Sequence, residues 1–296
     1  MKLRVVSANE LRMTCYTQGS GESLVVLAHG FPDDAATFVP LMERLAAPEL
    51  TLVAPYMRGY GPTSRAPDGR YFPADLGRDL LGVLDAFGAE RAVLIGHDWG
   101  ALAAYAAAGL APERVRGIVA LSVPPVPVLL ANLKRAPHQL LRSWYMFLFQ
   151  LGGLAELAMQ AGDQALIDAL WRAWSPGWRY PSPRLAKVKS TLARQGTTRA
   201  ALQYYRALGV GGAIEPSRWR ESYEVLTRPL TCPTLLLTGR RDRCIGHRMF
   251  HHPERAMAEG APIQLRIIEG CGHFPQHEAL DTVSAEIIEL LRGLVR

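Results

Sequence analysis

The sequence predicts an α/β fold in which a mostly parallel central sheet is flanked by helices and carries an inserted helical segment. Two observations support this fold class. First, short apolar runs alternate with helical patterns, as in sheets whose parallel strands are joined by helices. Second, the alternation stops between about residues 127 and 226, where helix formers and aromatic residues dominate. The 296 residues allow one large core with an insertion, but not several independent domains.

The chain opens with an expected β-hairpin, in which "LRVV" and "LRMTCYT" flank a turn at residues 7–10. Residues 24–28, "LVVLA", then form a wholly apolar run, which is typical of a strand buried on both faces. The same signature recurs at residues 50–55, 92–96, 117–122, 234–239 and 264–270. Helical patterns lie between the runs, at residues 37–47, 75–89 and 101–111.

The inserted segment is the second recognisable unit. It contains five of the six tryptophans, and proline-rich stretches mark its start, "SVPPVP", and its end, "TRPLTCP". We therefore predict a core formed by residues 1–126 and 227–296, and a helical cap formed by residues 127–226. Because ligands bind at the carboxyl ends of the strands in such sheets, we expect the cap to lie over that edge.

Composition and charge argue against several classes of function. The net charge is +6, but the 33 lysines and arginines are spread along the chain without a block of like charges or a nucleic-acid-binding motif. No run of about 18 apolar residues indicates a membrane span. The four cysteines form no C-x-x-C pair. We expect a cytoplasmic protein with free thiols that binds neither nucleic acid nor a membrane.

Three titratable side chains follow three of the predicted strands. Asp98 lies in "IGHDWG", on the turn between an apolar strand and an alanine-rich helix, where many hydrolases carry the serine of G-x-S-x-G. Asp242 follows the strand at residues 234–239, and His273 follows the strand at residues 264–270. Nucleophile, acid and histidine occur in this chain order in one large class of hydrolases.

On these residues the chain resembles the α/β-hydrolase fold over nearly its whole length. The matching strings are "HGFP" at 29–32, "RGYG" at 58–61, "GHDWG" at 96–100 and "GCGHF" at 270–274. Within that fold, an aspartate nucleophile followed by tryptophan resembles the epoxide hydrolases and haloalkane dehalogenases. A carboxylate suits attack on a saturated carbon, because the resulting ester can be hydrolysed at the enzyme's own carbonyl and the aspartate regenerated.

The resemblance implies a role for each residue of this triad. Asp98 is the expected nucleophile. His273, whose ordinary pKa near 6.5 leaves it neutral at pH 7, is expected to activate water. Asp242 is expected to hold the tautomer of the ring and to stabilise the imidazolium. The backbone N–H groups of Phe31 and Trp99 match the oxyanion-hole positions of the family.

Two tyrosines of the predicted cap match the phenols with which epoxide hydrolases protonate the ring oxygen. Tyr145, in "WYMFLFQLGG", resembles the first cap motif. The stretch "LQYYRA" is similar to the family's N-W-Y-R and places the second phenol at Tyr205; Tyr204 is the alternative, because Gln203 and Tyr204 depart from the motif. A dehalogenase often has a side-chain halide donor after "HG", whereas the Phe31 side chain cannot donate.

We therefore predict an epoxide hydrolase that adds water to a small apolar epoxide and releases a vicinal diol, without cofactor or metal ion, and with a homodimer as one possible assembly. A haloalkane or haloacid dehalogenase with the same triad is the first alternative, and a non-catalytic receptor on the same scaffold is the second. We expect His29 and His97 to make local hydrogen bonds. We expect His277 to lie on the surface at a helix start.

Overall fold

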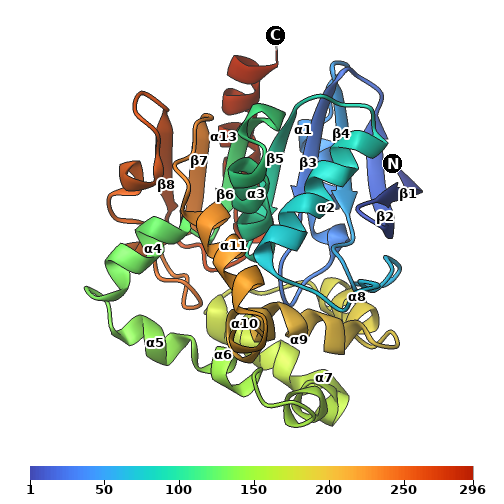
Figure 1. The fold of residues 1–296 in the computed structure, drawn as a ribbon, viewed down its shortest axis with the longest axis vertical. Helices are drawn as coiled ribbons and strands as arrows, with labels where there is room; N and C mark the ends of the chain where they lie inside the picture. Colours follow the sequence, from blue (N-terminus) through green and yellow to red (C-terminus); the bar gives the residue numbers. More distant parts are fainter. Residues whose placement is uncertain (296) are drawn as a thin grey trace.

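The computed structural model describes residues 1–295, and within them one eight-stranded sheet runs through the centre of the molecule (Figure 1). Helices cover both faces of the sheet, and a further group of helices lies beyond one end of it. The predicted α/β class is therefore confirmed. The strands are β1 (Lys2–Ala8), β2 (Leu11–Gly19), β3 (Ser23–Ala28), β4 (Leu50–Pro55), β5 (Ala92–His97), β6 (Val115–Leu121), β7 (Thr234–Gly239) and β8 (Ile263–Ile268).

The first two strands form the predicted hairpin, but its turn is shorter than expected. Only Asn9 and Glu10 separate β1 from β2, and both have a positive φ, 46° and 63°, as a two-residue type I′ turn requires. The strand order is β1-β2-β4-β3-β5-β6-β7-β8. The β1–β2 and β2–β4 pairs are antiparallel and the other neighbours are parallel.

The central strands send their side chains alternately into two hydrophobic cores. On β3, Val26 belongs to one core, while Val25 and Leu27 belong to the other. Because successive side chains of a strand point to opposite faces, a wholly apolar run fills both cores at once. One face is covered by α2 (Pro73–Ala86) and α3 (Trp99–Leu110), and the other by α1 (Val39–Leu45) and α13 (Leu280–Leu294) (Figure 1).

The last strand, β8, departs from this pattern. The prediction that it is buried on both faces is wrong, because β8 is an edge strand whose residues alternate between half-buried and exposed. Gln264 and Arg266 are its exposed positions. These two polar residues interrupt the apolar run in the sequence, and polar side chains of this kind protect edge strands from further pairing.

Between β6 and β7 the chain is helical, and most of this segment gathers beyond the end of the sheet (Figure 1). Trp99, at the start of α3, packs against Tyr205 of this segment, so the helices cover the edge at which β5 ends. The last helix, α11, instead returns to the core and packs against α3. The helices are α4 (Val126–Leu133), α5 (His138–Arg142), α6 (Trp144–Leu148), α7 (Leu154–Trp174, interrupted by non-helical residues at 161–164), α8 (Ser182–Leu192), α9 (Thr197–Leu208), α10 (Val210–Ile214) and α11 (Pro216–Thr227).

Short helical turns complete the fold. They are the 3-10 helices Ala35–Phe38, Pro112–Arg114, His247–Phe250 and Pro253–Ala256, together with α12 (Pro275–Glu278). Within the described part of the chain, none of the helices combines the length and the apolar character that crossing a bilayer requires.

Candidate active site

Asp98 stands on the sharp turn between β5 and α3. Its φ of 52° lies in the left-handed region, a conformation that costs a non-glycine residue about 1–3 kcal/mol and that recurs at functional sites. The start of α3 packs closely on β3, because a Cβ at Gly100 would lie only 1.9 Å from the carbonyl oxygen of Ala28. Glycine at position 100 thus allows the tight strand-to-helix turn that presents the Asp98 side chain.

The carboxylate of Asp98 lies against two backbone amides. The N–H of Phe31 donates to Oδ1 at 2.8 Å, and the amide of Trp99 also stabilises the carboxylate. Gly30 leaves the space for this approach, because a Cβ there would lie 2.4 Å from Oδ1 of Asp98. The structure therefore brings the two amides singled out in the sequence to the same carboxylate.

His273 and Asp242 lie next to this carboxylate. Nδ1 of His273 is 2.9 Å from Oδ2 of Asp242, and Nε2 of the same ring faces Oδ2 of Asp98 at 3.9 Å. The other oxygen of Asp242, Oδ1, accepts hydrogen bonds from the backbone N–H groups of Cys244 and Ile245 at 2.7 and 3.0 Å. Because a fixed carboxylate holds Nδ1, the ring presents Nε2 to Asp98.

The backbone of His273 is also held in place. Its carbonyl accepts from Oγ of Ser122 at 2.8 Å and lies 2.8 Å from Nε2 of His97, while its N–H donates to Oγ of Ser175 at 2.7 Å. His97 therefore makes a local hydrogen bond, as predicted. His29 does so too, since its Nε2 accepts from a backbone N–H of the loop after β4 at 3.0 Å.

Burial and charge hold the pKa values of Asp98 and His273 above their ordinary range. Burial raises the pKa of Asp98 to about 6, although His273 and the two neighbouring amides act in the opposite direction. Burial alone would lower the pKa of His273, but Cys244 and Asp242 beside the ring outweigh it and raise that pKa well above its ordinary value. The raised pKa favours an imidazolium in the resting site, whereas the sequence led us to expect a neutral ring.

Helix α9 turns Tyr205 toward the nucleophile. The ring packs edge-on against Trp99 and Phe31, with centroids 5.1 and 5.4 Å apart. The Tyr205 hydroxyl is buried and has no hydrogen-bond partner within residues 1–295. Burial, and after it the charge of Asp98, raises the pKa of Tyr205 well above its ordinary value. At neutral pH this phenol therefore keeps its proton and can donate it.

Tyr204 points to a different partner. Its hydroxyl donates to the backbone carbonyl of Arg58 at 2.9 Å. The buried guanidinium of Arg58 in turn donates to both carboxylate oxygens of Asp79, at 2.6 and 2.7 Å. The geometry thus favours Tyr205 over Tyr204 as the phenol that faces the site. The sequence did not predict the Arg58–Asp79 pair, although Arg58 begins the matching string "RGYG".

Tyr145 enters the site from α6. Its ring centroid lies 5.8 Å from that of Tyr205, and its hydroxyl lies 3.3 Å from Sγ of Cys244. Burial raises the pKa of Tyr145 well above its ordinary value, and Cys244, Tyr205 and Asp98 add to the effect. No sequence motif marks Cys244; its only signal is its place two residues after Asp242.

A buried ion cluster links the loop after β3 to the cap. Asp33 and Asp34 directly follow "HGFP", and the guanidinium of Arg184 on α8 pairs with both carboxylates. Half-buried His277 lies at the edge of this cluster, with Nε2 2.8 Å from Oγ1 of Thr37, and burial lowers its pKa to about 4. His277 lies at a helix start, as predicted, but it is only partly exposed, because its ring stacks on Trp178.

The site combines three kinds of chemical group. A carboxylate held by amides can attack an electrophile, an imidazole oriented by a second carboxylate can take a proton from water, and two buried phenols can donate protons. Within residues 1–295 no group of three or more histidine, cysteine, aspartate or glutamate side chains is placed to hold a metal ion. The arrangement is therefore suited to nucleophilic attack with proton transfer.

The chain is similar to known proteins along nearly its whole length. A model of the alpha/beta hydrolase fold matches residues 23–280. Epoxide hydrolase A of Mycobacterium tuberculosis is 30% identical over 98% of this chain and 97% of the relative, and the AB hydrolase superfamily protein YfhM of Bacillus subtilis is 27% identical over 99% of each. The crystal structure of epoxide hydrolase A from Mycobacterium thermoresistibile matches with a TM-score of 0.81 and 30% identity, covering 99% of this chain and 98% of that one.

Proposed function

The chain belongs to the alpha/beta hydrolase fold family, in its epoxide hydrolase branch, and from this premise we propose that it adds water to an epoxide through a covalent ester on Asp98. The reaction class is hydrolysis of an ether bond, and the product is a vicinal diol. One observation carries the mechanism: the Asp98 carboxylate lies between the amide of Phe31 and the imidazole of His273.

In the first step, Oδ2 of Asp98 forms a bond to a ring carbon, and the carbon–oxygen bond of the epoxide breaks. Oδ1 stays against the Phe31 amide and becomes the carbonyl oxygen of the ester. The charge on His273 lowers the pKa of Asp98 against the effect of burial, which keeps more of the carboxylate ionised for attack. The amide donor is in place before the reaction, so the step needs no reorganisation of the site.

Tyr145 and Tyr205 supply the proton that the ring oxygen needs as it departs. Burial raises the pKa of each phenol, so both carry a proton at neutral pH. The Tyr145 hydroxyl contacts the sulfur of Cys244. Because sulfur forms only weak hydrogen bonds, this contact is easily exchanged for one to the epoxide oxygen. One proton moves from a phenol to the ring oxygen, which becomes a hydroxyl group. Proton donation of this kind contributes about 10²–10⁴ in rate.

In the second step, His273 directs water at the ester. Ester formation removes the negative charge of Asp98, 3.9 Å from Nε2 of the ring, so the imidazolium loses a stabilising partner and its pKa falls. The imidazolium gives its proton to the phenolate, the neutral ring takes a proton from water, and the hydroxide adds to Cγ of Asp98. When the ester bond breaks, the carboxyl proton passes to the departing alkoxide. The diol leaves, and carboxylate and imidazolium are restored.

A single turnover in heavy-oxygen water tests the covalent route. With enzyme in excess over epoxide, we expect the first diol to carry no solvent oxygen, because its new hydroxyl comes from Oδ2 of Asp98. The label should appear in the Asp98 carboxylate and reach the diol only in later turnovers. Solvent label in the first diol would contradict the covalent ester.

His273→Gln provides a second test, because it leaves Asp98 and both amides in place. We expect this variant to accumulate the ester, detected by mass spectrometry as a peptide containing Asp98 heavier by one epoxide. The matched control is the double variant Asp98→Asn/His273→Gln, which should carry no adduct. Release of halide from haloalkanes, without diol formation from any epoxide, would instead favour a dehalogenase.

A further inference from the structure

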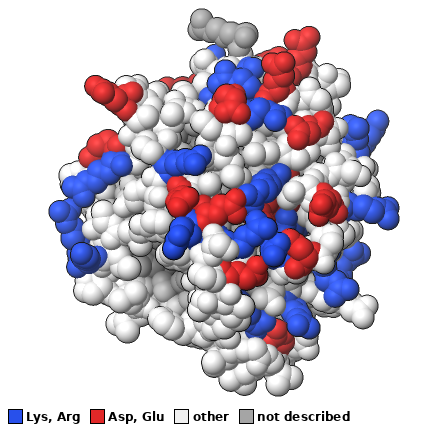
Figure 2. All heavy atoms as spheres, viewed as in Figure 1, with Lys and Arg blue, Asp and Glu red and all other residues white. Residues whose placement is uncertain are grey.

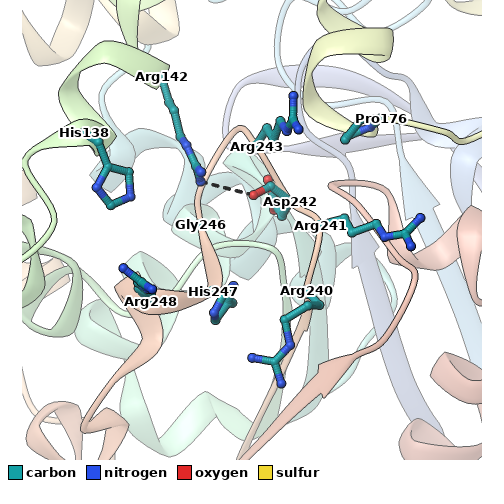
Figure 3. Close-up of a pocket in the computed structure, with 10 residues that line it drawn as sticks. All are labelled: His138, Arg142, Pro176, Arg240, Arg241, Asp242, Arg243, Gly246, His247 and Arg248. Atoms are coloured by element: carbon teal, nitrogen blue, oxygen red, sulfur yellow. Dashed lines mark hydrogen bonds between the residues drawn. The ribbon is translucent and has the colours of Figure 1, made fainter.

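A cavity of about 620 Å³ lies where the cap meets the core (Figure 3). Its walls are unusually basic, with one arginine from the cap and four from the segment after β7. They are Arg142 on α5, then Arg240, Arg241, Arg243 and Arg248. Figure 3 shows these side chains around the loop that carries Asp242. Of the residues assigned to the candidate active site, Asp242 lines this cavity, whereas Asp98, His273 and the two cap phenols do not.

Most of these arginines lack an acidic partner. Arg240 pairs with Glu269 at 2.9 Å, and Arg142 donates to the backbone carbonyl of Asp242 at 3.3 Å. For Arg241, Arg243 and Arg248 the described residues provide no carboxylate within 4.0 Å. The carboxylate of Asp242 is already engaged by His273 and by backbone amides.

Other arginines of the molecule are arranged differently. Arg58, Arg184 and Arg206 each pair closely with an acidic side chain. In contrast to these three pairs, the cavity brings together several arginines whose charge no described carboxylate compensates. Like charges gathered in one concave site raise its positive potential and attract an anion from solution.

Two histidines add to the basic character of this wall. His138 on α5 and His247 on the 3-10 helix His247–Phe250 both line the cavity. Burial and then the charge of Arg240 lower the pKa of His247 below its ordinary value. An anion bound here would weaken the effect of Arg240 on His247, because its negative charge would favour the imidazolium.

We propose that this cavity binds a small molecule bearing several phosphate groups. A guanidinium presents a planar fork of donors that fits a phosphate in two-point fashion, and arginines on more than one wall need more than one anionic group. A single carboxylate would neutralise only one of them. The volume falls within the range of sites for small organic ligands, so it accommodates a polyphosphate chain with an attached organic group.

Because the cavity lies between the cap and the core, a bound ligand would contact both. Arg142 belongs to the cap, and the other four arginines belong to the core segment between β7 and β8. A bound polyphosphate would therefore hold cap and core together through both sets of guanidinium groups. A ligand that binds only the folded chain raises its stability by mass action.

Titration calorimetry and thermal unfolding of the full chain with inorganic tripolyphosphate at low ionic strength test this site. We expect measurable binding and a rise in Tm of about 5 °C at about a hundred times Kd. Arg241→Gln and Arg248→Gln should each weaken binding about tenfold, and the double variant about a hundredfold. All three variants alter exposed side chains, so they leave the fold intact.

The matched control is Arg12→Gln, which removes an exposed arginine on β2, near the opposite edge of the sheet from β7. It should bind tripolyphosphate as the unaltered chain does; an equal loss in this variant would mean that the anion binds by net charge alone. A nucleoside triphosphate and an inositol polyphosphate, compared with tripolyphosphate, distinguish the sources of the phosphates by the added affinity of the organic part. Absence of binding, or citrate binding as tightly as tripolyphosphate, would overturn the proposal.

Discussion

The core half and the cap half of the candidate active site are held in place by different forces. On the core side, hydrogen bonds to backbone amides or to a charged partner hold Asp98, Asp242 and His273. On the cap side, aromatic packing holds Tyr145 and Tyr205, whose rings lie 5.8 Å apart, and the Tyr205 hydroxyl makes no hydrogen bond within the described residues.

This difference shows how the two halves divide the work. Hydrogen bonds between charged groups and fixed amides position atoms closely, as bond-making chemistry requires. Packed rings hold a hydroxyl near its place but leave its proton available. On the face drawn in Figure 2, charged side chains are frequent in the upper and middle parts and sparser in the lowest part, where Figure 1 places the cap helices. We therefore expect core substitutions to stop the reaction and cap substitutions to slow it.

The largest effect is expected for Asp98→Asn, which removes the nucleophile and keeps its volume. Activity should fall by about 10⁵-fold or more, because no ester can form. The same change should increase the free energy of unfolding at pH 7 by about 2–3 kcal/mol, since burial raises the pKa of Asp98 to about 6.

The sign of that stability change can be checked against pH. A carboxyl whose pKa is higher in the folded state stabilises the fold below its unfolded pKa, and this contribution is lost as pH rises through about 6. The advantage of Asp98→Asn in urea unfolding should therefore vanish near pH 4 and grow up to pH 7. A variant less stable than the parent at pH 7 would contradict this account.

A smaller loss is expected for Asp242→Asn, which keeps the shape of the core half but removes the charge that orients His273. By analogy with serine hydrolases, turnover should fall about 10⁴-fold. Ester hydrolysis should suffer more than ester formation, because the neutral base is needed only in the second step. Rapid-quench measurements should show an initial burst of ester and then slow diol release. An equal loss in both steps would mean that Asp242 supports the whole site rather than the base.

The cap half is tested by Tyr205→Phe. Loss of one of two proton donors should lower the rate of ester formation about 10²-fold. The matched control is Tyr204→Phe, which removes the hydrogen bond to the Arg58 carbonyl. That control should lose about 1 kcal/mol of stability but keep its rate of ester formation. The opposite pattern in the two variants would identify Tyr204 as the proton donor.

The smallest effect concerns pH. Because burial raises the pKa of Asp98 to about 6, the nucleophile becomes protonated as pH falls through that value. Single-turnover ester formation should be constant above about pH 7 and fall about tenfold per pH unit well below 6. An acid limb near pH 4, the range of an ordinary carboxyl group, would show that the core half is more solvated than its burial indicates.

Much of the fold and the core half of the site could be predicted from the sequence. Wholly apolar runs marked the central strands, because a strand that fills cores on both faces has no polar positions. Asp98, Asp242 and His273 could be placed together because each follows a strand of one sheet, and ends of parallel strands meet at the same edge. The partly polar run of β8 was harder to interpret, since its exposure depends on its place at the edge.

The cap half and the basic cavity required the tertiary structure. Two adjacent tyrosines on α9 differ in function only through the rotation of that helix against its neighbours, which spacing along the chain does not specify. Cys244 meets Tyr145, and Arg142 and Arg248 line one cavity, across about a hundred residues of sequence. The sequence by itself determined which residues end the strands, because strand formation depends on local apolar patterns. Only the tertiary structure decided which cap residues meet them, because packing between helices depends on the shapes of all the side chains at once.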